Sequence, residues 1–257
     1  MKREERRQQI VDLLVENHEV DLDSLAERFG VSKMTIHRDL DDLEKEGVLR
    51  KVRGGATVDA GTQFESDFRI RERQGHRAKL AMARRALELV EPGMTVMVND
   101  GSMAAVLGEM LPEKRPLTLI TNNVAILDRL RGENGITLIS LGGAYSAKFN
   151  AYLGVVTEAA LSQLRADIAF ISTPAVSGNL AYHMDDNVVR AKKAMMASSQ
   201  RSCLLVNHDR FGHTALHVMA ELAAFDNVIT DETPERSVLE TFEHARVKLT
   251  IATEEQT

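Results

Sequence analysis

The amino-acid sequence predicts an α/β protein built from two domains. Its 257 residues exceed the length of one average domain but fall short of three. Apolar residues recur at helical spacing within residues 21–56, whereas from His76 onward short apolar runs alternate with helical patterns. Such alternation is typical of a parallel sheet covered by helices. We therefore expect an N-terminal domain over residues 1–57, a linker over 58–75 and an α/β domain over 76–257.

Residues 21–45 have the pattern of two short helices joined by a tight turn. Gly30 follows the first helix, where a left-handed residue commonly closes a helix, and Ser32 is placed to cap the second. The apolar residues that share a helix face are Leu22, Leu25, Ala26 and Phe29 in the first helix and Ile36, Leu40 and Leu43 in the second. This spacing predicts a helix-turn-helix, whose second helix enters the major groove of DNA.

The second helix begins with polar side chains that suit contacts with DNA, while Met34 or Ile36 must point inward. After Gly47, Val alternates with Lys and Arg up to the pair Gly54-Gly55, which predicts a β-wing that lays cations on the phosphates. The residues expected to contact DNA are Ser32, Lys33, Thr35, His37, Arg38, Arg50, Lys51 and Arg53. An amphipathic hairpin with a solvated basic loop is the alternative, but it does not explain why these polar residues cluster.

The charge of the chain argues only mildly against nucleic-acid binding. The net charge is −6, and even residues 1–56 carry eleven Lys and Arg against thirteen Asp and Glu. The acids are expected on helix faces that point away from DNA, so the local placement of cations decides phosphate contacts. Non-specific affinity should therefore be modest, and specific contacts should matter more than usual.

Composition also bears on the compartment and on the core. Aromatic residues make up 4% of the chain, so the core must be aliphatic. The single cysteine, Cys203, lies in an apolar run and is expected to be a buried strand thiol. No apolar run approaches the length of a membrane span, and residues 2–7 are charged with no apolar segment behind them. These features favour a cytoplasmic protein.

Periodicity places the remaining elements. A first helix is expected over 3–16, a short edge strand at Val20 and a helical start near Phe64 or Gln74. Strands are expected over 95–98, 117–120, 136–139, 168–171, 202–206, 227–230 and 247–252. Helices are expected over 78–90, 102–111, 123–130, 158–164, 188–198, 214–222 and 235–245.

Three successive strands of the expected sheet end in small polar residues. They run into Asn99-Asp100-Gly101-Ser102, Thr121-Asn122-Asn123 and Ser140-Leu141-Gly142-Gly143. In open α/β sheets, ligands bind beyond the carboxyl ends of the strands. Backbone N–H groups and short hydroxyls that converge there can hold a phosphate or the hydroxyls of a sugar.

The run from Val31 to Leu40, with Leu43, Gly47 and Arg53-Gly54-Gly55-Ala56, resembles the signature of the DeoR family of bacterial transcriptional regulators. That family pairs a winged helix-turn-helix with a sugar-phosphate-sensing domain related in fold to ribose-5-phosphate isomerase. His37 stands where the family usually has Arg. The resemblance therefore implies an N-terminal winged helix-turn-helix followed by a ribose-5-phosphate-isomerase-like α/β effector domain.

The resemblance spans nearly the whole chain and also covers the strand ends. Residues 207–212 stand where the family has Asp-x-Ser-Lys-Phe-Gly, so Arg210 replaces the common Lys, and Arg can bind a phosphate bidentately. The implied effector-binding residues are Asp100, Gly101, Ser102, Thr121, Asn122, Asn123, Gly142, Gly143 and Arg210.

The function expected from these observations is that of a sequence-specific DNA-binding regulator, most often a repressor in this family, of a carbohydrate-catabolic operon. Its effector would be a phosphorylated sugar or polyol. Two-fold operators imply a homo-oligomer, a dimer or a tetramer. No cofactor and no membrane partner are expected.

Three other interpretations compete with this one. His208, His213 and His217 could form a metal cluster, but neither a Cys nor an obvious carboxylate completes it, so no metal is expected. Asp100 with Arg210 could serve a sugar-phosphate isomerase, yet Arg exchanges protons poorly, so an enzyme is not expected. A scaffold whose winged helix binds protein is a third possibility.

Overall fold

The computed structural model describes residues 1–58 and 67–252, which form two units, Met1–Gln74 and Gly75–Thr257. The helical start expected near Phe64, and residues 59–66 of the linker expected over 58–75, lie outside the described residues. Helix α4 (Phe68–Arg73) belongs to the N-terminal unit, because Ile70 is buried in the core of that unit.

The N-terminal unit is a winged helix-turn-helix, as predicted. Its other elements are α1 (Arg3–Asn17), β1 (Glu19–Asp21), α2 (Leu22–Phe29), α3 (Lys33–Lys45), β2 (Arg50–Val52) and β3 (Gly55–Thr57). The three strands form an antiparallel sheet in the order β1-β3-β2. Val20 pairs with Ala56, which confirms the expected edge strand. Gly55 permits this pairing, since a Cβ there would lie 1.9 Å from the carbonyl oxygen of Val20.

Local capping fixes the two central helices of this unit. Asp21 accepts a hydrogen bond from the backbone N–H of Ser24 at 2.9 Å, which holds the pKa of Asp21 below its ordinary value. Gly30 closes α2 in the left-handed conformation with φ of 63°. Ile36 is fully buried whereas Met34 is 61% exposed, so Ile36 is the residue that points inward.

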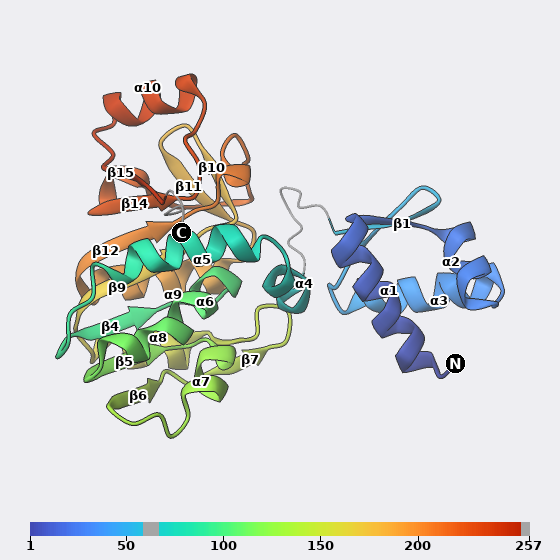
Figure 1. Cartoon of the computed structure of the whole chain (residues 1–257), viewed down its shortest axis with the longest axis horizontal. Coiled ribbons are helices and arrows are strands. Elements are labelled where there is room, and N and C mark those ends of the chain that lie inside the picture. The colour runs from blue at the N-terminus through green and yellow to red at the C-terminus, as the bar shows by residue number, and fades with distance from the viewer. Residues whose placement is uncertain (59–66, 253–257) are drawn as a thin grey trace. The chain divides into compact units, whose positions relative to one another are not determined.

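The C-terminal unit is built on a seven-stranded parallel sheet (Figure 1). The strand order is β15-β14-β12-β9-β4-β5-β6, and every neighbouring pair is parallel. The strands are β4 (Thr95–Val98), β5 (Leu117–Thr121), β6 (Ile136–Ser140), β9 (Ala166–Ser172), β12 (Ser199–Leu205), β14 (Asn227–Thr230) and β15 (Leu249–Ile251). All seven strands expected from the apolar runs are present in this sheet.

Helices cover both faces of the sheet. Alternate residues of the strands belong to different core clusters, so Val96 and Val98 pack on one face and Met97 on the other. The helices are α5 (His76–Leu87), α6 (Ser102–Met110), α7 (Val124–Leu130), α8 (Val155–Ser162), α9 (Asp186–Ala197) and α10 (Arg236–His244). Among the described residues, no helix has both the length and the apolar character needed to cross a bilayer.

Two smaller sheets complete the unit. One is a hairpin of β7 (Ala144–Ser146) and β8 (Ala151–Leu153). The other joins β10 (Ala175–Ser177), β11 (Leu180–His183) and β13 (His217–Glu221) in antiparallel pairs.

The prediction of a helix over 214–222 is wrong, because residues 217–221 form β13, which pairs with β11. Ala215, Met219 and Leu222 are all buried, and their spacing imitates one face of a helix. Only Met219 of the three lies in the strand, since Ala215 precedes it and Leu222 begins the short 3-10 helix η3 (Leu222–Ala224). Pairing with β11, and not the helix-like spacing of these apolar residues, therefore decides the backbone conformation of the segment.

Candidate DNA-binding surface and effector site

The start of α3 presents polar side chains to solvent. Ser32, Lys33, His37 and Arg38 are exposed, whereas the opposite face of the helix is buried through Ile36, Asp39, Leu40 and Leu43. The exposed set is the one expected to enter a major groove.

Ion pairs from α1 hold the buried face of α3. Arg6 donates from Nε to Asp39 at 2.5 Å, and both side chains are buried. Arg3 lies 3.5 Å from the other oxygen of Asp39 and also pairs with Asp42, while Arg7 pairs with Glu46. These cations of the charged N-terminal segment therefore orient α3.

The eight residues expected to contact DNA fall into three groups. Ser32 and Thr35 cap α3, because the N–H of Thr35 donates to the Ser32 hydroxyl at 3.2 Å and the two hydroxyls lie 2.9 Å apart. Lys33 pairs with Asp23 at 2.7 Å, and Lys51 pairs with Asp41. The hydrogen bond from Lys51 holds the pKa of Asp41 below its ordinary value.

The third group has no internal side-chain partner. The side chains of His37, Arg38, Arg50 and Arg53 make no hydrogen bond or ion pair with any residue that the structure describes. Arg38 lies on α3, whereas Arg50 and Arg53 lie in the wing. These three guanidinium groups are the cations that can reach phosphates without breaking an internal pair.

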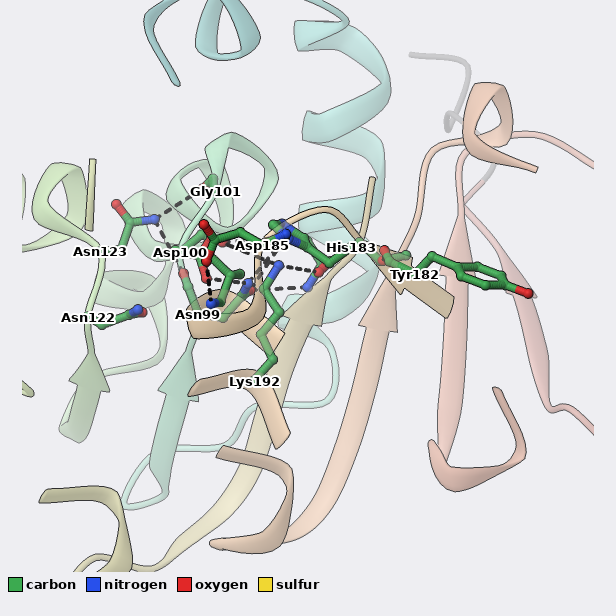
Figure 2. Close-up of polar contacts among 12 residues, drawn as sticks. Asn99, Asp100, Gly101, Asn122, Asn123, Tyr182, His183, Asp185 and Lys192 are labelled. Atoms are coloured by element: carbon green, nitrogen blue, oxygen red, sulfur yellow. Dashed lines mark hydrogen bonds and ion pairs between the residues drawn. The ribbon is translucent and has the colours of Figure 1, made fainter. Parts of the chain in front are cut away.

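In the C-terminal unit, the loops after β4 and β5 meet at one edge of the sheet (Figure 2). The side-chain amide of Asn123 donates to the carbonyl oxygen of Gly101 at 3.0 Å and to that of Asn99 at 3.3 Å. Its Oδ1 accepts from the N–H of Ala125 at 3.1 Å and so caps α7. Thr121 donates to the carbonyl oxygen of Val98 at 2.6 Å. The structure therefore brings together the predicted residues of these two loops.

A buried lysine from α9 joins this group, although the sequence did not single it out. Nζ of Lys192 donates to the carbonyl oxygen of Ser172 at 2.9 Å and lies 3.9 Å from Oδ2 of Asp100. The side chains of Lys192 and Asp100 are 3% and 2% exposed. Figure 2 shows Lys192 pointing toward Asp100, whereas Tyr182 points away. The available signal was that Val188, Lys192 and Met195 share one helix face, which puts a charge on an apolar side.

The loop before α9 fixes the place of that helix. Asp185 caps α9 by accepting from the N–H of Val188 at 3.1 Å. The N–H of Asp185 donates to Nδ1 of His183 at 3.1 Å, and His183 is buried beside the ring of Phe149. His183 therefore acts as an acceptor at Nδ1 and orients the turn that leads into α9.

Asn122 offers an unused acceptor. Its amide Nδ2 donates to the carbonyl oxygen of Tyr152 at 3.0 Å, and its backbone carbonyl accepts from the N–H of Tyr152 at 2.9 Å. Its Oδ1 is buried and has no hydrogen-bond partner within the described ranges. A buried unpaired oxygen costs roughly 1–3 kcal/mol, which a hydroxyl donor from a ligand would recover.

The glycine pair after β6 has a packing role. The carbonyl oxygen of Gly142 accepts from the hydroxyl of Thr157 at 2.7 Å. At Gly143, where φ is 121°, a Cβ would lie 2.3 Å from the Thr157 hydroxyl and 2.6 Å from the carbonyl oxygen of Leu153. This close approach requires glycine whether or not a ligand binds.

The structure does not place Arg210 beside the other predicted residues. It ends the 3-10 helix η2 (His208–Arg210), which follows β12, and β9 separates β12 from β4. The side chain of Arg210 makes no hydrogen bond or ion pair with the described residues, Asp100 included. The cation beside Asp100 is Lys192, so the pair that an isomerase was expected to use is not formed.

Comparison with known families decides the relationship. Residues 6–62 match the DeoR-like helix-turn-helix domain, and residues 74–232 match the DeoR C terminal sensor domain. The chain belongs to the DeoR family.

Relatives of this DeoR-family chain are named as transcriptional regulators. The glycerol-3-phosphate regulon repressor of Escherichia coli strain K12 is 26% identical over 97% of this chain and 99% of its own length. The L-fucose operon activator of Haemophilus influenzae is 28% identical over 80% of this chain and 83% of its own. Ribose 5-phosphate isomerase A of Methanocaldococcus jannaschii matches with a TM-score of 0.40 and 18% identity over 54% of this chain and 55% of that protein.

Two further sequence interpretations concern cysteine and histidine in this DeoR-family chain. Cys203 is buried in β12, as expected, and burial raises the pKa of its thiol to about 12. His213 and His217 do not join His208 in a metal-binding group among the described residues. Burial acts to lower the pKa of His208, but the hydrogen bond and negative charge of Asp231, with Asp209 and Glu232, outweigh it and raise that pKa.

Proposed function

We propose that this protein represses a carbohydrate-catabolic operon by binding its operator, and that a phosphorylated sugar or polyol changes its affinity for that DNA. The observation that carries this proposal is the buried pair of Lys192 and Asp100 at the carboxyl ends of the strands. Relatives named for a glycerol-3-phosphate regulon and a fucose operon support a small phosphorylated or sugar-derived effector.

DNA binding is assigned to the exposed side of α3 and to the wing. In the major groove, His37 and Arg38 would contact base edges or nearby phosphates, and Arg50 and Arg53 would contact the backbone beside it. Lys33 and Lys51 first have to leave Asp23 and Asp41, so their contribution to affinity is smaller. Sequence-specific binding thus depends on few cations.

Effector binding is assigned to the loops after β4, β5 and β6, with Lys192 beneath them. An anionic group on the ligand would pair with Lys192, whose neighbouring charge in the described structure is Asp100. Hydroxyl groups would donate to the free Oδ1 of Asn122, and Ser102 supplies a short hydroxyl from the loop after β4, while Thr121 holds the two loops together through its bond to Val98. Arg210 keeps its place in this proposal only if the loop after β12 moves toward the ligand.

Regulation follows if the effector and the operator favour different conformations of the protein. Binding of either one then changes the affinity of the protein for the other by the same factor. A two-fold operator calls for two recognition helices, so the protein acts as a homo-oligomer. The assignment of residues 1–57 to DNA, 58–75 to a linker and 76–257 to effector and assembly belongs to this proposal, as does action in the cytoplasm.

A panel of sugar phosphates and polyol phosphates tests the proposal. Full-length protein is first used to select bound fragments of genomic DNA, and each compound is then tested for release of the selected fragment. The same compounds are screened by thermal shift, since a ligand that binds only the folded state raises the melting temperature. One compound should do both. A protein that binds no DNA fragment in a sequence-specific manner would contradict the proposal.

The competing function is a sugar-phosphate isomerase. Its strongest support is that Asp100 lies beside a cation that can exchange protons, Lys192, at 3.9 Å. Conversion of ribose 5-phosphate or a related aldose phosphate by the purified protein, lost in Asp100→Asn, would favour that function. We expect no turnover with any compound that releases DNA.

A further inference from the structure

A second polar cluster lies away from the proposed effector loops, beside a cavity of about 830 Å³. The cavity is lined by the N-terminal half of α5, by the loops after β12 and β14 and by the end of β15. Its polar lining includes Arg77, Asn207, His208, Asp231 and Glu232. The proposed function uses none of these residues.

The ring of His208 is held in one orientation. Its Nδ1 lies 2.7 Å from Oδ2 of Asp231, and Asp231 has a side chain that is only 5% exposed. Asp231 also accepts from the backbone N–H of His208 at 2.7 Å, from Nδ2 of Asn207 at 2.9 Å and from the hydroxyl of Thr230 at 3.3 Å. The oxygens of Asp231 are therefore occupied, and the hydrogen bond at Nδ1 leaves Nε2 as the outward-facing nitrogen.

Two further carboxylates face that nitrogen. Nε2 of His208 lies 3.0 Å from Oδ1 of Asp209 and 3.9 Å from Oε2 of Glu232. Both acids are solvent-exposed, at 72% and 69%, so they can adjust and a solute can reach them. Asp209 directly follows His208 in the chain, whereas Glu232 follows a different strand, so local sequence does not place Glu232 beside the imidazole.

We propose that His208, Asp209 and Glu232 bind a divalent transition-metal ion of the Zn²⁺ type, with Asp231 as the positioning residue behind the imidazole. Metal–ligand bonds of about 2.1 Å in tetrahedral geometry set ligand atoms roughly 3.4 Å apart, and the separations of 3.0 and 3.9 Å measured from Nε2 bracket that value. Asp209 does not belong to the group of side chains whose ligand atoms all lie within 4.8 Å of one another, which is His208, Asp231 and Glu232, so the exposed side chain of Asp209 has to turn toward Glu232 when the ion binds. A carboxylate that holds the second nitrogen of a metal-binding histidine is the usual support of such sites. The three protein ligands leave a position for water or an anion from the cavity.

The donor set decides which cation fits. An imidazole nitrogen with two carboxylates suits Zn²⁺, Co²⁺, Ni²⁺ or Mn²⁺, whereas Mg²⁺ and Ca²⁺ prefer oxygen ligands alone. The local charge points the same way, because three carboxylates surround a single imidazole. This site differs from a cluster of His208, His213 and His217, since its other ligands are carboxylates.

Isothermal titration of the tag-free, full-length protein with Zn²⁺ in a non-chelating buffer tests the site. The chelator-treated wild type should bind one equivalent per chain. Asp209→Asn with Glu232→Gln, and separately His208→Gln, should weaken the affinity by about tenfold or more. The exposed His213 gives a matched control, and His213→Gln should leave the titration unchanged. Circular dichroism of each variant checks that the fold is intact.

Several results would overturn the metal site. These are the absence of a stoichiometric Zn²⁺ equivalent, an affinity that none of the ligand substitutions changes, or an equal loss in His213→Gln. Mg²⁺ binding as tight as that of Zn²⁺ and independent of His208 would show a carboxylate cluster without a nitrogen ligand. Because the exposed acids Asp209 and Glu232 can be neutralised without loss of packing, the double variant remains informative even if His208→Gln misfolds.

Discussion

Arg38 is the residue whose removal should weaken DNA binding most selectively. It is exposed on α3 and has no internal partner in the described parts of the chain. A lost arginine contact to a base or phosphate costs about 1–3 kcal/mol, so Arg38→Ala should weaken operator binding roughly five- to 150-fold. Fluorescence anisotropy with labelled operator measures this. Arg28, exposed on α2, is the matched control, and an equal loss in Arg28→Ala would argue against a specific role for Arg38.

Lys192 is the residue on which effector binding should depend. Replacing it with Met keeps a similar length and removes the buried charge that sits 3.9 Å from Asp100. Loss of a charge-assisted hydrogen bond costs about 1.5–3 kcal/mol, so Lys192→Met should weaken effector affinity by roughly ten- to a hundredfold. Calorimetry with the compound found in the screen measures it.

The double variant Asp100→Asn with Lys192→Met separates binding from folding. It removes both charges, so an isolated buried carboxylate cannot destabilise the protein. If the double variant regained full effector affinity, Lys192 would serve only to neutralise the buried charge of Asp100 and would not contact the effector. Operator affinity without effector should stay close to that of the wild type in both variants.

Residue-scale features were the hardest to predict from sequence. The runs around Asp100 and Asn122 stand out because several small polar residues follow an apolar strand directly. Lys192 depends instead on contacts with strands far away in the chain, and local spacing gives only the hint that it shares a face with Val188. The pairing of His208 with Asp231 joins the ends of two neighbouring strands, which no local pattern encodes.

At the scale of elements, the orientation of α3 should depend on its ion pair with α1. Asp39→Ala leaves Arg6 buried without its partner, and breaking a buried pair in this way costs about 3–5 kcal/mol. We expect the N-terminal unit of the variant to unfold at a clearly lower urea concentration and operator binding to fall with it.

Arg3 provides the comparison for that experiment, because its side chain is 56% exposed and contacts the same carboxylate. Exposed pairs contribute about 0–1 kcal/mol, so Arg3→Ala should change the urea midpoint little. Similar losses in both variants would mean that Asp39 acts through its exposed neighbours and that the buried pair is unimportant.

The elements that were predicted correctly from the sequence are those whose conformation has one dominant physical cause. The central strands are continuous apolar runs because both of their faces are covered by helices, and all of them were expected. The strands of the small sheet, such as β11 and β13, are short and partly polar, so pairing between them decides their conformation. The helix wrongly expected over 214–222 shows the same limit of local periodicity.

For the whole molecule, a regulator of this kind requires reciprocal coupling between effector and operator. If the effector weakens operator binding by some factor, saturating operator must weaken effector binding by the same factor. Typical coupling of 1–3 kcal/mol corresponds to roughly five- to 150-fold, which calorimetry with and without operator can resolve. Arg38→Ala should lower operator affinity with and without effector alike and leave this factor unchanged, because it alters DNA contacts in both conformations. An apparent dissociation constant for operator that kept rising with the compound concentration and never reached a plateau would show that the compound competes for the operator surface and does not act from the loops around Lys192.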